Sequence, residues 1–202
     1  YSSISQAGFI IAPLAVSRIT GNYQDGIFAS VTYLIIYAFM NIGAFLSVHL
    51  FTNFTKSDNF YEWGGIAKHS PLTGVLTTVF FFSLAGIPPL GGWFAKFVVF
   101  RSLLSTGEII GVSLAIVGAI NAVIALVYYA RISKVIWMDE LKNPEEEKSF
   151  EFQSPLKVVG ALTVLITFVA GIFPGIFSYL GEVSSIFLVI KTWNSKNLIT
   201  IF

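Results

Sequence analysis

The sequence predicts an all-α fold, a polytopic bundle of about five transmembrane helices, one of which is broken. Of its 202 residues, 55% are hydrophobic and only 11% are charged, whereas soluble domains carry about 25% charged residues. The apolar residues gather in long runs that short polar loops separate. One of these runs has two prolines at its centre. Together these features indicate a protein whose main solvent is lipid.

The first predicted span covers residues 2–19 and begins with unusually polar side chains. Ser2 and Gln6 lie on one helix face at i, i+4, and Ser3 and Ser5 flank them. Two interpretations are open. Small polar residues hydrogen-bond neighbouring helices within membranes, or Gln6 and Ser3 belong to a hydrophilic path inside the bundle.

The second predicted span covers residues 27–51 and carries a polar stripe. Tyr33, Tyr37 and Asn41 follow one another at intervals of four residues on an otherwise apolar helix. The tyrosines either bond to neighbouring backbone or, together with Asn41, face an ionisable centre and hold water there.

The third apolar run, residues 72–104, is too long for one crossing. As a single helix it would measure about 50 Å, against a hydrocarbon core of about 30 Å. Proline removes amide donors and glycine lets the backbone leave helical dihedrals. We therefore predict two half-helices, residues 72–85 and 93–104, joined by an unwound segment at 86–92. The residues that break the run are Gly86, Pro88, Pro89, Gly91 and Gly92.

Lys96 lies one turn past this break, among apolar neighbours. A charged lysine at the centre of a spanning helix costs about 2.5–3.5 kcal/mol on insertion scales. Since burial disfavours the charged form, a buried lysine can exchange a proton near neutral pH, which arginine cannot. A broken helix beside an ionisable residue is a common transporter site. Lys96 is thus the candidate proton-transfer residue; the alternative is a lysine that reaches the headgroups or makes a static pair.

Two further spans, residues 109–138 and 156–173, complete the prediction. The segment 139–153 between them is a charged linker. The last residues are mixed in character and are expected to lie along the membrane surface. The chain is accordingly divided into a transmembrane domain at 1–180 and an interfacial tail at 181–202.

The loops predict the orientation. The face that carries residues 52–70 and 138–155, with the adjacent helix ends, holds seven Lys and Arg, and the opposite face holds four. The positive-inside rule places the first face in the cytoplasm or matrix. The seven are Lys56, Lys68, Arg131, Lys134, Lys142, Lys148 and Lys157; the four are Arg18, Arg101, Lys191 and Lys196.

Composition argues against several functions. A net charge of +1 does not suggest a nucleic-acid partner, and the absence of cysteine removes thiolate metal sites and thiol redox chemistry. With only two histidines, no metal site is expected.

Three stretches carry a resemblance to a known family. S-S-I-S-Q-A-G-F (residues 2–9), Y-L-I-I-Y-A-F-M-N-I-G-A-F (33–45) and S-L-A-G-I-P-P-L-G-G-W-F-A-K-F-V-V-F (83–100) resemble the antiporter-like membrane subunits of respiratory complex I, the proton-pumping NADH:quinone oxidoreductase. The resemblance covers about residues 1–138 and is closest to the subunit N (ND-two) type. It implies the C-terminal portion of such a subunit, holding most of the second inverted repeat.

The resemblance also implies a function. Lys96 matches the lysine of the family's broken helix, and Gln6 falls where many relatives have histidine. The chain would translocate protons, driven by quinone reduction elsewhere in the complex. NADH, flavin (FMN), iron–sulfur clusters and quinone would be bound by other subunits. The expected partners are the M, K and J types and the lipid of a bacterial inner or mitochondrial inner membrane. The alternatives are a subunit of a multisubunit sodium/proton antiporter and a structural membrane scaffold.

Overall fold

The computed structural model describes residues 2–140 and 154–199. The predicted linker from residue 141 on, and residues 200–202 of the predicted tail, lie outside the described residues. Within the described ranges the secondary structure is entirely helical, which confirms the predicted all-α class. The elements are α1 (Ser2–Thr20), α2 (Tyr23–Thr55), the 3-10 helix η1 (Phe60–Trp63), α3 (Ile66–His69), α4 (Pro71–Ala85), α5 (Gly91–Ser105), α6 (Ile109–Met138), α7 (Ser154–Ile172) and α8 (Gly175–Ile199).

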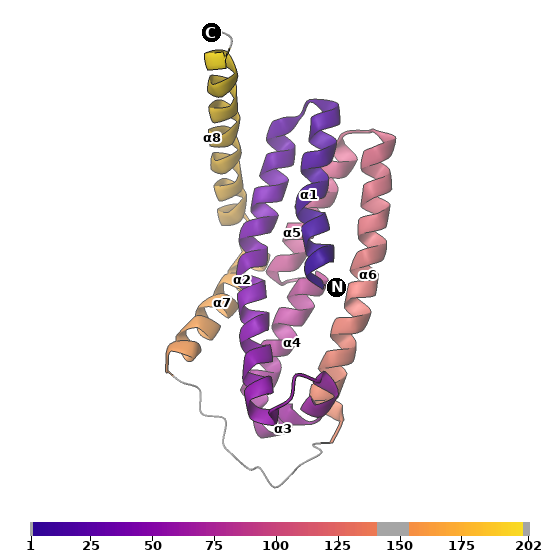
Figure 1. Cartoon of the computed structure of the whole chain (residues 1–202), viewed down its shortest axis with the longest axis vertical. Coiled ribbons are helices and arrows are strands. Elements are labelled where there is room, and N and C mark those ends of the chain that lie inside the picture. Colours follow the sequence, from indigo (N-terminus) through magenta and orange to yellow (C-terminus); the bar gives the residue numbers. More distant parts are fainter. Residues whose placement is uncertain (1, 141–153, 200–202) are drawn as a thin grey trace.

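The long helices α2 and α6 run from one end of the bundle to the other, whereas α4 is continued by α5 and α7 by α8 (Figure 1). By length and composition α2 and α6 can each cross a membrane alone, and α7 with α8 forms one further candidate span that is bent by 88°. α4 and α5 have 15 residues each, about 22 Å of helix, so neither reaches across a core of about 30 Å by itself. The first helix rises from mid-height to the upper end in Figure 1.

The break in the third apolar run lies where proline and glycine predicted it. α4 ends at Ala85 and α5 begins at Gly91, so the second half-helix starts two residues earlier than expected. Ser83 explains part of this shift, because its hydroxyl accepts a hydrogen bond from the Gly92 amide at 3.1 Å and satisfies one free donor of the new helix.

The C-terminal region differs from the expectation in its boundaries. α7 ends at Ile172, just before Pro174, and α8 resumes at Gly175, so residue 181 lies inside a helix and does not begin a separate element. Phe177, Gly181 and Ser185 are buried at intervals of four residues. This narrow face of α8 packs against the upper half of α2. Whether α8 lies at a membrane interface stays a prediction.

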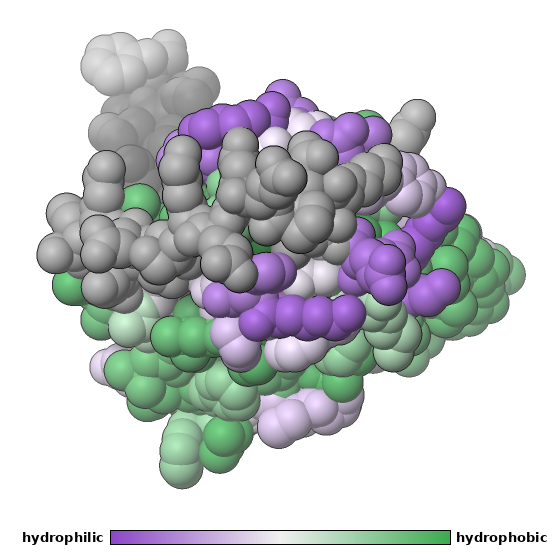
Figure 2. Space-filling view, turned by 90° about the horizontal axis from the view of Figure 1, so that it is seen from below, coloured by the Kyte–Doolittle hydropathy of each residue, from purple (hydrophilic) through white to green (hydrophobic). Residues whose placement is uncertain are grey.

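The lower end of the bundle is closed by the segment between α2 and α4. Trp63 and Ile66 are buried there against Phe51 and Ile136. The Arg131 guanidinium donates a hydrogen bond to the Tyr61 hydroxyl, which ties this segment to α6. Figure 2 shows hydrophilic residues gathered on this end, as expected for a surface in water. The exposed charged side chains here are Lys56, Asp58, Lys68, Arg131, Lys134, Asp139 and Glu140.

Candidate functional site

The end of α4 leaves two backbone carbonyls without helical partners. Gly86 adopts a left-handed conformation with φ 95°, which favours glycine because a Cβ is strained there. Its amide donates to Ser83 O at 2.9 Å, and the Ile87 amide donates to Phe82 O at 3.0 Å. This Schellman arrangement satisfies two of the four free carbonyls at a helix end. The carbonyls of Leu84 and Ala85 remain free to accept other donors.

Lys96 binds both of these carbonyls. Its Nζ lies 2.9 Å from Leu84 O and 2.6 Å from Ala85 O, and the residue is only 5% exposed. The C-terminal end of a helix carries a partial negative charge, so α4 stabilises the ammonium of a lysine on the following half-helix. The unwound segment therefore creates the binding position of the amine.

The third direction around the Lys96 amine faces an aromatic ring. Nζ lies 5.2 Å from the centroid of Phe9, within the range of a cation–π contact. An ammonium has three N–H donors, and a neutral amine has two together with a lone pair. The two carbonyls can be satisfied in either state. The site consequently accommodates both protonation states, and the proton that differs between them faces Phe9.

A short polar chain leads from Lys96 to α2. Gln6 on α1 donates to Leu84 O at 3.1 Å, so it shares an acceptor with Lys96. The Tyr33 hydroxyl in turn donates to Gln6 Oε1. One turn before Gln6, the hydroxyls of Ser2 and Tyr129 are hydrogen-bonded to each other. The structure thus brings together Lys96, Gln6 and Tyr33 among the predicted site residues.

The other residues of the predicted path lie farther out. Tyr37 is half-buried, with its ring centroid 6.5 Å from that of Tyr33. Asn41 is also half-buried, and Ser3 is exposed on α1. Residues spaced by four are rotated by about 40° around a helix. The stripe therefore begins at Tyr33 in the core and has turned toward the edge of the core at Asn41.

The remaining residues of the predicted broken segment form the turn and the first turn of α5. Pro88 and Pro89 lie between the two half-helices, and Gly91 and Gly92 begin α5. The Trp93 indole donates to Gly171 O on α7 at 3.3 Å. The break between α7 and α8 therefore lies directly against the break between α4 and α5.

Four participants were not predicted from the sequence. They are the carbonyls of Leu84 and Ala85, the ring of Phe9 and the hydroxyl of Tyr129. Phe9 follows Gln6 at i+3 and so shares its helix face, which is the one pattern that could have identified it. A backbone carbonyl carries no residue type to recognise.

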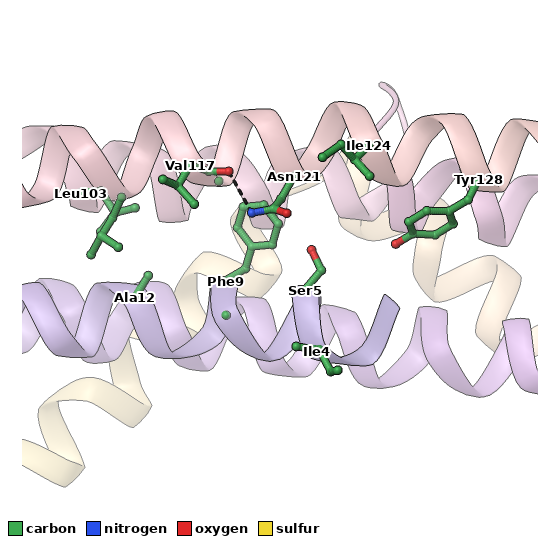
Figure 3. Close-up of a pocket in the computed structure, with 12 residues that line it drawn as sticks. Ile4, Ser5, Phe9, Ala12, Leu103, Val117, Asn121, Ile124 and Tyr128 are labelled. Atoms are coloured by element: carbon green, nitrogen blue, oxygen red, sulfur yellow. Dashed lines mark hydrogen bonds between the residues drawn. The ribbon is translucent and has the colours of Figure 1, made fainter. Parts of the chain in front are cut away.

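A cavity of about 620 Å³ lies between α1 and α6 (Figure 3). Its walls are mostly apolar, with polar side chains from Ser5, Asn121 and Tyr128. Asn121 donates to Val117 O at 3.0 Å. The Tyr128 hydroxyl is buried and has no hydrogen-bond partner within the described residues. Phe9 forms part of the wall on the side of Lys96.

Comparisons with known proteins identify the family to which the chain belongs. Residues 1–124 match the family described as NADH:quinone oxidoreductase/Mrp antiporter, transmembrane. The chain is 38% identical over 188 residues to NADH-quinone oxidoreductase subunit N 2 of Rhizobium meliloti, covering 92% of this chain and 36% of the relative. It is 33% identical over 174 residues to NADH-quinone oxidoreductase subunit N of Moorella thermoacetica, covering 86% and 34%. The chain thus spans about a third of the length of these relatives.

A solved structure shares the fold. Respiratory complex I from Thermus thermophilus, with bound aureothin, contains a chain that matches at a TM-score of 0.59 and 23% identity. The match covers 88% of this chain and 38% of that one. Together with the apolar spans, the family match confirms the prediction made from the sequence: this membrane protein belongs to the NADH:quinone oxidoreductase/Mrp antiporter transmembrane family.

Proposed function

We propose that the chain is part of a proton-translocating subunit of an NADH:quinone oxidoreductase, of the subunit N type, and that Lys96 carries the proton. The relatives that bear that name support the assignment to this enzyme. The observation that carries the role of Lys96 is its geometry: a buried amine on two helix-end carbonyls, with its third direction toward the ring of Phe9.

The proposed mechanism depends on which groups balance the positive charge of Lys96. α1, α4 and α5, which surround the amine, contain no acidic residue. Charge on Lys96 is therefore balanced by helix-end carbonyls, whose partial charges are weaker than a carboxylate. A carboxylate would hold the proton tightly, whereas two carbonyls allow its release when the surrounding charge changes. Gln6 and Tyr33 extend hydrogen bonding laterally toward α2.

In this proposal the chain is one part of a multisubunit complex. NADH, flavin, iron–sulfur clusters and quinone are bound by other subunits, and quinone reduction there drives the change at Lys96. The partners are other membrane subunits of the complex, of the M, K and J types, within an energy-transducing membrane such as the bacterial inner or mitochondrial inner membrane.

The test replaces Lys96 in the assembled complex. Lys96→Ala is expected to lower the number of protons pumped per NADH oxidised while leaving assembly intact. Lys96→Arg should not restore pumping fully, because arginine stays charged. Lys134→Ala, an exposed lysine at the lower end, is the control and should pump normally. Normal pumping by an assembled Lys96→Ala complex would refute the proton role.

A multisubunit sodium/proton antiporter is the second candidate, because the matching family includes such antiporters. The two functions differ in their partners and in the ion. Purification of the chain with flavin- and iron–sulfur-containing subunits supports the oxidoreductase. Sodium-dependent proton exchange by a complex without those subunits would support the antiporter. A scaffold would pump normally whatever residue replaces Lys96.

A further inference from the structure

Phe9 is the point at which four helices meet around the Lys96 amine. Its ring stacks on Tyr33 of α2, with centroids 5.7 Å apart and planes at 14°, and meets Phe100 of α5 edge-on at 6.0 Å. A Cβ at Gly118 of α6 would lie 3.1 Å from Phe9 Cε1. The ring, which belongs to α1, thus reaches α6 across the space between the two helices. Only 5% of the residue is exposed.

The same ring separates two different environments. On one side lies the Lys96 amine, 5.2 Å from the ring centroid. On the other lies the 620 Å³ cavity between α1 and α6, of whose wall Phe9 is a part. Figure 3 shows Phe9 pointing from α1 toward α6, behind Asn121.

The cavity has the size and the polar groups to hold water. A water molecule occupies about 30 Å³ in the liquid and needs two to four polar partners. Asn121 and Ser5, which line the cavity, offer such partners.

We infer that the cavity between α1 and α6 supplies water to Lys96 and that Phe9 is the positioning residue that keeps this water from the amine until its ring turns aside. The two carbonyls occupy the other directions, so the exchangeable proton faces the ring. Stacking on Tyr33 and the edge contact with Phe100 hold the ring in the closed position. This inference rests on the proposed role of Lys96, but it concerns water access and can be measured without pumping.

Cysteine accessibility tests the inference in membranes that contain the assembled complex. The chain has no cysteine, so a label found on it by mass spectrometry reports an introduced thiol. The probe is 2-(trimethylammonium)ethyl methanethiosulfonate, whose permanent charge keeps it in water and which forms a mixed disulfide with the thiolate as methanesulfinate leaves. Asn121→Cys, in the cavity, should react fast, and Lys96→Cys should react slowly while Phe9 is present.

Adding Phe9→Leu to Lys96→Cys should raise the labelling rate about tenfold, which corresponds to a barrier lower by about 1.4 kcal/mol. Phe9→Tyr keeps the ring and should leave the rate low. Thr77→Cys, fully buried on α4 away from the cavity, reports general loosening and should stay unreactive in either background. If Phe9→Leu prevents assembly, Phe9→Met takes its place, because it preserves volume without a flat ring.

Three results would overturn the inference. Asn121→Cys could resist labelling, which would mean that the cavity is filled by lipid or protein. Lys96→Cys could react at the same rate with and without the ring. Phe9→Leu could raise the labelling rates of Lys96→Cys and Thr77→Cys together, which would mean that the substitution loosens the whole bundle. Normal pumping by Lys96→Ala would instead remove the proton role of Lys96 and leave these rates unchanged, so the two failures are distinguishable.

Discussion

Gln6 and Lys96 donate to the same backbone oxygen, Leu84 O, at 3.1 and 2.9 Å. The two side chains come from different helices, and the shared carbonyl belongs to a third. A change at one donor consequently alters the acceptor that the other uses. α1 is thereby coupled to the lysine through a carbonyl of α4.

Replacing Gln6 with leucine is expected to weaken pumping and stability together. The buried Tyr33 hydroxyl would lose its acceptor, and an unsatisfied buried polar group costs about 1–3 kcal/mol. Gln6→His retains a donor and an acceptor and should have the smaller effect. Protons pumped per NADH, measured beside the melting temperature of the solubilised complex, check this. Equal behaviour of the leucine and histidine variants would contradict a hydrogen-bonding role.

Gly86→Ala is expected to displace the Lys96 side chain. Its φ of 95° is strained for any residue with a Cβ, at a cost of roughly 1–2 kcal/mol. The added carbon would lie 2.8 Å from Lys96 Cδ. Both effects should lower stability and coupled pumping.

Gly8→Ala is the matched control for that change, since a Cβ there meets nothing within 4 Å. It should melt and pump like the unchanged complex. A Gly86→Ala complex that is equally unaffected would show that the left-handed turn is not required for the site.

The orientation derived from the loops can be tested with two exposed carboxylates. Asp58 belongs to the lower end of the bundle, and Glu108 precedes α6 at the upper end. Asp58→Cys should react with a membrane-impermeant thiol reagent only in inside-out vesicles, and Glu108→Cys only in intact cells. The reverse pattern would overturn the positive-inside assignment.

Gly171→Ala is expected to disturb the contact between the two helix breaks. A Cβ at this position would collide with the Pro89 carbonyl oxygen and would lie 2.6 Å from Leu90 C. Overpacking of this kind costs about 1–3 kcal/mol, so the melting temperature should fall. Gly160→Ala on the same helix meets only a flexible leucine end at 3.4 Å and should be neutral. Equal melting temperatures of the two variants would show that the breaks are not tightly packed.

Residue types were sufficient to predict the all-α class, the broken helix and the buried lysine. Proline and glycine act on the backbone locally, so their positions alone were enough to place the start of the break after Ala85, although α5 begins at Gly91 and not at residue 93. Lys96 stood out because a charge is costly in an apolar run. The resemblance carried by three motifs then indicated the family.

The partners of Lys96 could not be predicted in the same way. Leu84 and Ala85 contribute backbone oxygen, which every residue has. Gln6 reaches Leu84 across 78 positions in the sequence, and such a contact follows from helix packing rather than from a local pattern. The sequence predicted that the last span ends at residue 173, just before Pro174. It did not predict the helix that resumes at Gly175, because α8 depends on packing against α2.

The hydrogen bond from Trp93 to Gly171 has a mechanical consequence. Trp93 lies three residues before Lys96 on the same short helix, and Gly171 lies just before the bend that leads into α8. If α5 tilts to move the lysine off its carbonyls, this link either breaks or pulls on α7. A movement of α7 and α8 would then displace Lys96 through α5, and a movement of Lys96 would displace α7 and α8.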